Sequence, residues 1–332
     1  MSKAFDAVGI LGIGASLPEK VLTNYDLEKM VDTSDEWITK RTGISERRIL
    51  PEDVPAYMLG IDAAKKALVN AGMDAEDIDL IIVTTSTPDY LTPSTSCIIQ
   101  DGINAKKAAA FDLNAACSGF IYGMSVVRQF IINGTYKHIL LVACEALSKV
   151  TDWKDRNTCV LFGDGVGAAV FGPVEKDYGI LATHLGADGS LGRCLTIPCC
   201  SINDEDLEKR PNGNKMTLWM DGSEVFKFAV RVVSQAVTRV LDEKNLNLDD
   251  ISMIIPHQAN IRIIDGASKR LGIPQEKMYK NLHKYGNISS ASIPVALCEA
   301  VSEDMVKKGD NIVLVGFGGG LTWASALLRW NK

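Results

Sequence analysis

Two apolar segments in the first half of this sequence return in the second half at one common spacing. EDIDLIIV at 76–83 is matched by DDISMIIP at 249–256, and HILLV at 138–142 is matched by NIVLV at 311–315, each 173 positions later. Each first segment follows an amphipathic helical pattern and a polar turn, and each later one precedes glycines and a closing strand. A duplicated strand–helix unit is the simplest explanation of this order.

The two copies meet near Pro173 to Gly179, which predicts an N-terminal half over residues 1–174 and a C-terminal half over residues 175–332. The near-continuous apolar run HILLVACE at 138–145 is typical of a strand in a sheet covered on both faces. A chain of 332 residues has room for roughly two domains. We therefore predict an α/β fold that is internally duplicated and layered.

Four local patterns lie outside these strands. Residues 56–71 predict an amphipathic helix, and residues 158–173 predict two short strands around a glycine-rich turn. The glycines there are a weak dinucleotide signal because a strand, not a helix, follows them. Residues 33–49 read as a charged loop carrying Trp37, which is either a surface staple or a stacking platform for a flat ligand. Residues 199–215 predict a polar surface excursion.

Composition limits the classes of protein open to this chain. With 46% hydrophobic and 23% charged residues it is an ordinary globular sequence, and its net charge of −6 argues against a general nucleic-acid binder. No apolar run reaches the roughly 18 residues of a membrane span, and the first residues resemble a strand more than a secretory signal. Eight cysteines without C-x-x-C and four histidines without metal spacing predict no metal, no disulfide framework and a reducing cytoplasm.

One cysteine stands where a strand pattern gives way to a helix pattern. In FDLNAACSGF at 111–120, Cys117 follows small residues, and apolar residues then recur at helical spacing. The free N–H groups and partial positive charge of a helix start favour thiolate over thiol. Cys117 is thus a candidate nucleophile, while the alternative reading is a buried structural cysteine.

Three further features map to the same end of a duplicated parallel sheet, where ligands bind. His257 follows the strand SMIIP, Asn287 stands just before the helix of 293–306 in the place that corresponds to the Cys117 region, and a glycine turn spans 316–320. This set suits acyl transfer: Cys117 attacks a thioester, and its N–H and one from the turn hold the oxyanion. His257 and Asn287 can donate to a second carbonyl and stabilise an enolate. Alone, each would be read as a structural residue.

The motifs DLNAACSGF, PHQANIRI, YGNISSASIP and GFGGGLTW, with TSDEWITKRTGI near the start, closely resemble β-ketoacyl-acyl-carrier-protein synthase III of bacterial type II fatty-acid synthesis. The resemblance runs in order over essentially the whole chain. It implies the thiolase fold, an α-β-α-β-α sandwich, in a homodimer without a cofactor. It also implies the catalytic triad Cys117, His257 and Asn287, with Gly319 as our choice for the second oxyanion donor.

By the same resemblance, a short acyl-coenzyme A (acyl-CoA) acylates Cys117, and malonyl-acyl-carrier protein (malonyl-ACP) then enters. His257 and Asn287 bind its thioester carbonyl, and decarboxylation produces the carbanion that attacks the acyl-enzyme. The product would be a 3-ketoacyl-ACP, acetoacetyl-ACP if the primer is acetyl. The loop PDYLTP at 88–93 departs from the expected pattern, so acetyl and branched primers both stay open.

The resemblance also assigns residues around the centre. Those matching coenzyme A contacts are Thr33, Trp37, Arg41, Arg156 and Asn260. Those matching the acyl tunnel are Leu147, Phe226 and Leu91. The basic candidates for carrier-protein docking are Arg262, Lys269 and Arg270, which share one face of a predicted helix, with Lys227 and Arg231 as extensions. The alternative for this basic face is an ordinary solvated helix surface.

Other members of the fold fit less well. Thiolases use a second cysteine near the C-terminal glycine turn, and GFGGGLTW has none. Elongating synthases use two histidines, whereas this chain has Asn287 at the second position. Plant-type polyketide synthases share Cys-His-Asn but are usually longer, so a related condensing enzyme of secondary metabolism is the main alternative. A non-catalytic chain partner is disfavoured because the triad and the glycine turn are all present.

Overall fold

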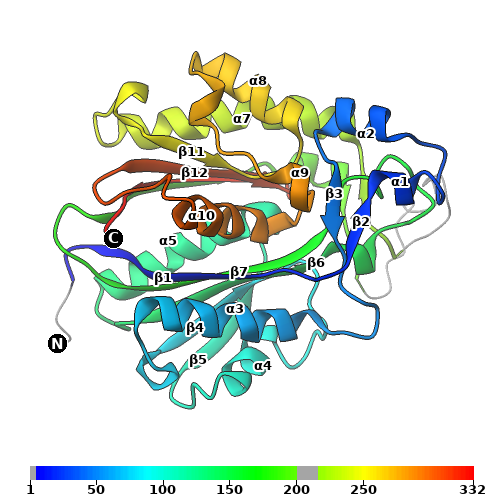
Figure 1. Cartoon of the computed structure of the whole chain (residues 1–332). Helices are drawn as coiled ribbons and strands as arrows, with labels where there is room; N and C mark the ends of the chain where they lie inside the picture. Colours follow the sequence, from blue (N-terminus) through cyan, green and yellow to red (C-terminus); the bar gives the residue numbers. More distant parts are fainter. Residues whose placement is uncertain (1–4, 200–215) are drawn as a thin grey trace.

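The chain folds into five layers in the order helix, sheet, helix, sheet, helix (Figure 1). The computed structural model describes residues 5–199 and 216–332. The surface excursion expected at 199–215 therefore lies, except for Cys199, outside the described residues. The fold confirms the prediction of a layered, internally duplicated α/β sandwich.

The first sheet has the strand order β1-β7-β6-β4-β5. Its strands are β1 (Val8–Ser16), β4 (Leu80–Thr84), β5 (Ala109–Leu113), β6 (Ile139–Ala146) and β7 (Asp164–Pro173). The second sheet has the order β11-β12-β13-β8. Its strands are β8 (Gly179–Ala187), β11 (Met253–Pro256), β12 (Asn311–Gly318) and β13 (Thr322–Arg329).

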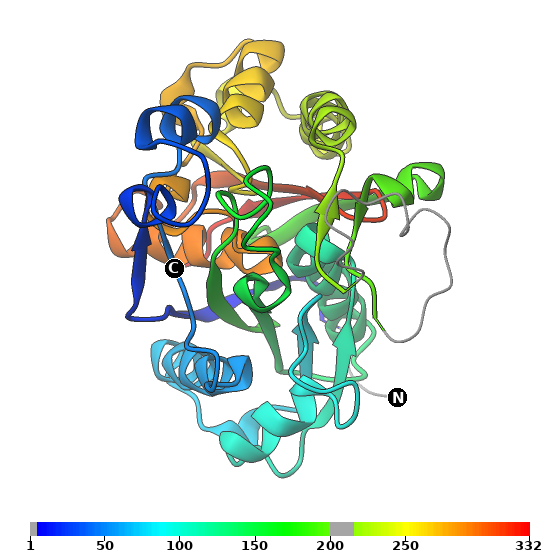
Figure 2. The same cartoon turned by 90° about the vertical axis from the view of Figure 1, so that its right-hand side faces the viewer.

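The outer helices are α3 (Ala56–Ala71) and α4 (Thr95–Gly102) on the first sheet and α7 (Gly222–Asp242) and α8 (Ile261–Leu271) on the second. Between the sheets lie α5 (Gly119–Ile132) and α10 (Ser292–Ser302). The perpendicular view shows the α7–α8 layer at one end of the stack and α3 at the other (Figure 2). Shorter helices and strands among the described residues are β2 (Val21–Thr23), α1 (Asn24–Leu27), α2 (Asp35–Thr42), β3 (Glu46–Arg48), β9 (Leu195–Thr196), β10 (Trp219–Met220) and α9 (Leu282–Tyr285).

The duplication extends to the register of strand pairing. Leu80 of β4 pairs with Ile139 of β6, and Met253 of β11 pairs with Ile312 of β12, both in parallel. Each residue of the second pair lies 173 positions after its counterpart in the first, the spacing found in the sequence. The two halves thus repeat one unit residue by residue at their centre.

The central helices are buried on almost all sides because each half contributes one of them to the space between the sheets. Phe120 and Met124 of α5 and Ile293 and Leu297 of α10 have no exposed surface. Every residue of β4 and β6 is likewise buried, as expected for strands covered on both faces. This packing holds the first turns of α5 and α10 rigidly against the strand ends.

Two local predictions are wrong. Helix α2 (Asp35–Thr42) forms where a loop was expected, because Ser34 caps its N-terminus and Gly43, at φ 78°, ends it. The first of the two strands expected within 158–173 does not form, and β7 begins only at Asp164. The stretch before it, 158–163, instead forms turns that line the site described next.

Candidate active site

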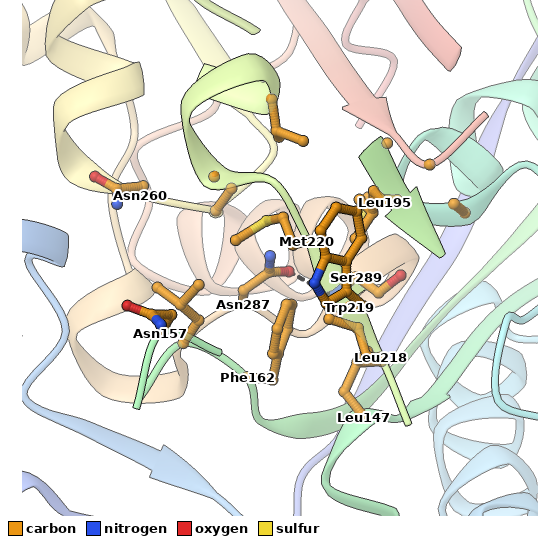
Figure 3. Close-up of a pocket in the computed structure, with 18 of the residues that line it drawn as sticks. Leu147, Asn157, Phe162, Leu195, Leu218, Trp219, Met220, Asn260, Asn287 and Ser289 are labelled. Carbon is orange, nitrogen blue, oxygen red and sulfur yellow. Dashed lines mark hydrogen bonds between the residues drawn. The ribbon is translucent and has the colours of Figure 1, made fainter. Parts of the chain in front are cut away.

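A cavity of about 1110 Å³ opens at the carboxyl ends of the central strands and is lined by residues from both halves. Cys117, His257, Asn287 and Gly319 all line it. They come from the turn before α5, the loop after β11, the loop before α10 and the turn after β12. Figure 3 shows Asn287 in this pocket beside labelled neighbours that include Phe162.

The Cys117 turn is fitted closely to the glycine turn of the other half. A Cβ on Gly318 would lie 2.5 Å from the Cys117 nitrogen, so only glycine allows this approach. Next to it, Ser118 Oγ lies 2.6 Å from Thr322 Oγ1, which joins the two halves directly beside the thiol. A Cβ on Gly319 would lie 3.5 Å from Ala116 Cβ, which places this second turn residue against the same backbone.

Burial is the largest influence on the pKa of Cys117. It raises the pKa of this thiol from 9.0 to about 12, with Ser289 lowering the pKa and the Glu145 carboxylate raising it further. That rise corresponds to about 4 kcal/mol, whereas a helix terminus contributes about 0.3–2 kcal/mol. Burial therefore outweighs the helix start, and the thiol form of Cys117 is favoured over the expected thiolate.

His257 is held as a neutral imidazole. Burial lowers the pKa of its ring from 6.5 to about 3. Its Nδ1 lies 2.7 Å from Ser292 Oγ, and the backbone N–H of Gln258 donates to that oxygen at 3.4 Å. The serine hydroxyl can then donate to Nδ1, an arrangement that favours the proton on Nε2. A neutral Nε2–H is a hydrogen-bond donor without a charge.

Asn287 is oriented through its side-chain oxygen. Asn287 Oδ1 accepts a hydrogen bond from the Ser289 N–H at 2.9 Å, so Nδ2 is the atom that can donate to a ligand. Its backbone is fixed on both sides, because its N–H donates to Leu161 O at 2.8 Å and its carbonyl accepts from Gly163 N at 3.1 Å. The glycine-rich stretch 158–163 thus holds this carboxamide in place.

Trp37 of α2 is half-buried and stands at the entrance close to two guanidinium groups. Arg41 Cζ lies 5.2 Å and Arg156 Cζ 5.6 Å from the centre of its ring. All three residues, and Asn260, line the cavity. Thr33 does not line it, and its Oγ1 is buried without a hydrogen-bond partner among the described residues. Four of the five expected coenzyme A contacts therefore share this entrance.

Two of the three residues assigned to the acyl tunnel line the cavity, and one does not. Leu147, which is buried, and Phe226 of α7 line the cavity. Leu91 does not line it and is 68% exposed. The loop at 88–93 lies on the surface of the protein. Leu91 therefore does not line the acyl tunnel of its own chain, contrary to the expectation.

The basic residues proposed for docking lie on α7 and α8, which pack together. Arg262 reaches the cavity and stacks on Phe226, with Cζ 5.5 Å from the ring centre. Lys227, Lys269 and Arg270 are exposed and outside the cavity lining, and Lys227 bonds Glu224 at 2.7 Å. Arg262 therefore links the exposed basic surface to the pocket.

The sequence-based interpretation missed Glu145, the last polar residue of β6, and the serines that follow Asn287. Glu145 has no exposed surface, although strand β6 is otherwise apolar or small. An acidic residue in a strand predicted to be covered on both faces was the available signal, because such a group needs buried partners. Its partners are considered below.

No helix within the described residues has the length and apolar character needed to cross a membrane. Residues 5–199 and 216–332 also contain no group of three or more His, Cys, Asp or Glu side chains that could hold a metal ion.

The duplicated fold, with its pocket between the halves, defines an acyltransferase of the thiolase fold, a condensing enzyme. Models of 3-oxoacyl-[acyl-carrier-protein] synthase III and of its C-terminal part match residues 111–189 and 241–330. The β-ketoacyl-[acyl-carrier-protein] synthase III of Caldanaerobacter subterraneus is 53% identical over 326 residues, 98% of both chains. The chain belongs to the β-ketoacyl-ACP synthase III family, the enzymes that catalyse the initiating condensation of fatty-acid synthesis.

Other relatives agree with this assignment. A synthase III of Bacillus anthracis is 52% identical over 325 residues, 98% of this chain and 99% of the relative. The crystal structure of the Aquifex aeolicus synthase III is 47% identical with a TM-score of 0.91, covering 98% of this chain and 100% of that one. A priming β-ketosynthase from the R1128 polyketide pathway, at 35% identity and a TM-score of 0.92, covers 100% of this chain and 98% of its own. This structure of a polyketide-pathway enzyme thus shares the fold at lower identity.

Proposed function

We propose that this acyltransferase joins a short acyl-CoA primer to malonyl-ACP through an acyl-Cys117 intermediate and releases a 3-ketoacyl-ACP. The observation that carries the proposal is that Cys117, His257 and Asn287, far apart in sequence, line one cavity whose entrance holds Trp37. Acetyl is the primer we favour, by family resemblance.

In the first half-reaction the Cys117 sulfur bonds to the thioester carbon of acyl-CoA. The bond between that carbon and the coenzyme A sulfur breaks, and the thiol proton leaves with coenzyme A as its free thiol. The N–H groups of Cys117 and Gly319 hold the oxyanion of the intermediate. The high pKa of the buried thiol favours a transfer in which proton loss accompanies attack.

In the second half-reaction the malonyl carboxylate leaves as carbon dioxide and its electron pair passes to the neighbouring carbon. Asn287 Nδ2 and the neutral Nε2–H of His257 donate to the thioester oxygen and stabilise the enolate. The carbanion then bonds to the acyl carbonyl and displaces the Cys117 thiolate, which recovers a proton. A neutral donor suits this step because an imidazolium would be costly in so buried a position.

Around this centre we assign Trp37, Arg41, Arg156 and Asn260 to coenzyme A, and Leu147 and Phe226 to the acyl chain. For adenine to stack between Trp37 and Arg156, the guanidinium must move away from its present 5.6 Å position. We assign the acidic carrier protein to the basic surface formed by Arg262, Lys269, Arg270 and Lys227.

The assembly we propose is a homodimer. Strand β5 stands at the edge of the first sheet, and its Phe111 is 36% exposed. Tyr90 and Leu91 in the loop before α4 are 53% and 68% exposed. An unpaired edge strand with exposed apolar side chains is a natural site for pairing with a second copy. Because Leu91 is exposed and outside the cavity of its own chain, we assign it to this contact with the second copy.

Three broader parts of the proposal concern the cellular location, the use of a cofactor and the boundary between the two halves. The protein works in the cytoplasm and uses no cofactor, acyl-CoA being a substrate. The two halves are residues 1–174 and 175–332, and support for this boundary is that β7 ends at Pro173 while β8 begins at Gly179.

A primer panel tests the proposal. Malonyl-ACP is offered with acetyl-, branched and longer acyl-CoA, and 3-ketoacyl-ACP is measured by mass spectrometry. We expect condensation with short primers, lost in Cys117→Ala and retained in Cys97→Ala, which removes an exposed cysteine away from the cavity lining. Condensation only with acceptors other than malonyl-ACP would overturn it and favour the secondary-metabolism alternative.

A further inference from the structure

Glu145 is a buried carboxylate held entirely by hydrogen bonds from two distant segments. Its Oε2 accepts from the N–H and the hydroxyl of Ser86, both at 3.1 Å, and from Thr87 Oγ1 at 3.0 Å. Its Oε1 accepts from Ser290 Oγ at 2.7 Å and from Ser290 N at 3.4 Å. Ser86 and Thr87 belong to the first half and Ser290 to the second, so Glu145 connects the two halves, and its partner Ser86 lines the pocket.

The internal repeat gives this contact a counterpart. Ser290 lies 173 positions after Cys117, and Gly318 lies 173 positions after Glu145. The contact between Glu145 and Ser290 is thus the equivalent, in the other half, of the contact between Gly318 and Cys117. The preceding backbone matches as well, with φ of 46° at Ala116 and 48° at Ser289.

The two equivalent places differ in one respect. Gly318 has no side chain to place beside the Cys117 N–H, and both residues line the cavity. In the other half the longer side chain of Glu145 fills the corresponding space, and its Oε1 accepts a hydrogen bond from the Ser290 N–H. The chain therefore contains, within itself, an anionic oxygen bound to the N–H that corresponds to the proposed oxyanion donor of Cys117.

We propose that Glu145 is a positioning residue: its carboxylate occupies the counterpart of the oxyanion site and thereby fixes the loop that carries Asn287. The inference rests on the roles proposed above for Cys117 and Asn287. It extends them to a residue that does not touch substrate.

The loop after Asn287 transmits this constraint. Glu145 holds Ser290 through two hydrogen bonds, and Ser289, its neighbour, donates its N–H to Asn287 Oδ1. Displacing Ser290 would therefore rotate the carboxamide that we assign to the malonyl carbonyl. The negative charge of Glu145 also contributes to raising the pKa of Cys117, whereas the Ser289 hydroxyl lowers that pKa.

A glutamine in place of Glu145 would keep the size and remove the charge. The glutamine NH₂ group is itself a donor, and it would point either at the donors of Ser86 and Thr87 or at the donors of Ser290. Two donors cannot bond to each other, so the residues on that side must move. We expect the kcat of condensation to fall roughly 10- to 100-fold in Glu145→Gln, while the KM for acyl-CoA stays unchanged. We also expect iodoacetamide to alkylate Cys117 faster at about pH 8, because a negative neighbour has been removed.

Asp164→Asn is the matched control. Asp164 is another fully buried carboxylate, held by the N–H groups of Leu50 and Ser148 and by Ser148 Oγ. Asp164 is not one of the groups that shift the pKa of Cys117. This variant is expected to lose stability while its Cys117 alkylation rate stays that of the parent.

The full-length variants are compared by condensation kinetics, by self-acylation of Cys117 and by alkylation rate. If Glu145→Gln fails to fold, Ser290→Ala replaces it, with condensation expected to fall and self-acylation to persist. Asn287→Ala is measured in parallel. If it condenses normally, the proposed function fails; if it is impaired while Glu145→Gln or Ser290→Ala condenses like the parent, only the present inference fails. A Glu145→Gln protein that is merely less stable, with unchanged kcat and alkylation rate, would also overturn it.

Discussion

Nδ1 of His257 lies 2.7 Å from Oγ of Ser292, the first residue of α10, and both side chains are buried. In the other half the corresponding positions are Thr84 and Gly119, which lie 173 residues earlier. The first turn of a central helix thus faces a strand-end residue in each half. Only in the second half does it provide a hydroxyl that sets the tautomer of an imidazole.

Replacing Ser292 by alanine should impair the decarboxylating step. Loss of a buried hydrogen bond costs about 1–3 kcal/mol, or roughly 5- to 150-fold in kcat, while self-acylation of Cys117 should persist. Nitrogen-15 NMR should show His257 shifting from a single tautomer to a mixture. Ser325→Ala is the control, because this buried hydroxyl donates to Ala236 O at 2.7 Å and lies outside the cavity lining. An unchanged kcat and tautomer in Ser292→Ala would contradict this role.

The neutral His257 should make the fold sensitive to acid. Its pKa is about 3 when folded and 6.5 as a model value, so the unfolded chain binds the proton more readily and stability falls as pH drops from about 6.5 toward 3. Between pH 7 and pH 5 this group should cost about 2 kcal/mol of unfolding free energy. Urea denaturation at both pH values, with His257→Asn for comparison, measures the difference. Equal pH dependence in the two proteins would show that His257 is not buried and neutral.

Gly318→Ala should damage the nucleophile directly. The new Cβ would lie 2.5 Å from the Cys117 nitrogen, so the turn must shift. We expect a loss of about 1–3 kcal/mol in stability and a severe loss of self-acylation with labelled acyl-CoA. Gly189→Ala is the control, since a Cβ there meets nothing within 4 Å. Normal acylation in Gly318→Ala would mean that the two turns do not depend on each other.

Trp37→Ala should weaken coenzyme A binding without changing the chemistry. Stacking on this ring contributes about 0.5–2 kcal/mol, so the KM for acyl-CoA should rise roughly 2- to 30-fold. The kcat at saturating primer should stay unchanged. The Trp37→Phe variant should retain much of the affinity for acyl-CoA. Steady-state kinetics with acyl-CoA varied checks this. A fall in kcat with KM unaltered would place Trp37 in the catalytic step instead.

The sequence predicted the centre of the fold well because the repeat lies in buried strands. The apolar pattern and the spacing of these strands can be read from the sequence without knowing what surrounds them. The common spacing anticipated that Leu80 and Ile139 pair as Met253 and Ile312 do. It also predicted His257 at the end of strand β11 and Asn287 in the loop before helix α10, both near Cys117. Helix α2 was predictable too, from Ser34 before acidic residues and from Gly43 at its end, but the high charge of the segment suggested a loop.

Properties that depend on burial were not predictable. The helix start was visible beside Cys117, but the pKa of the thiol follows from how completely both halves enclose it. Glu145 looked like the end of a strand because its partners come from residues 86–87 and 290. Leu91 was placed by resemblance, and the exposed course of its loop separates it from the cavity of its own chain.

Transfer of a labelled acetyl group from acetyl-CoA tests the central claim most directly. The protein is incubated with the labelled primer alone, digested, and the modified peptide is located by mass spectrometry. We predict that the label lies on the peptide containing Cys117, that Cys117→Ala takes up none, and that adding malonyl-ACP discharges it as a labelled 3-ketoacyl-ACP. Uptake of label by Cys117→Ala, or a labelled Cys117 that malonyl-ACP does not discharge, would contradict the account.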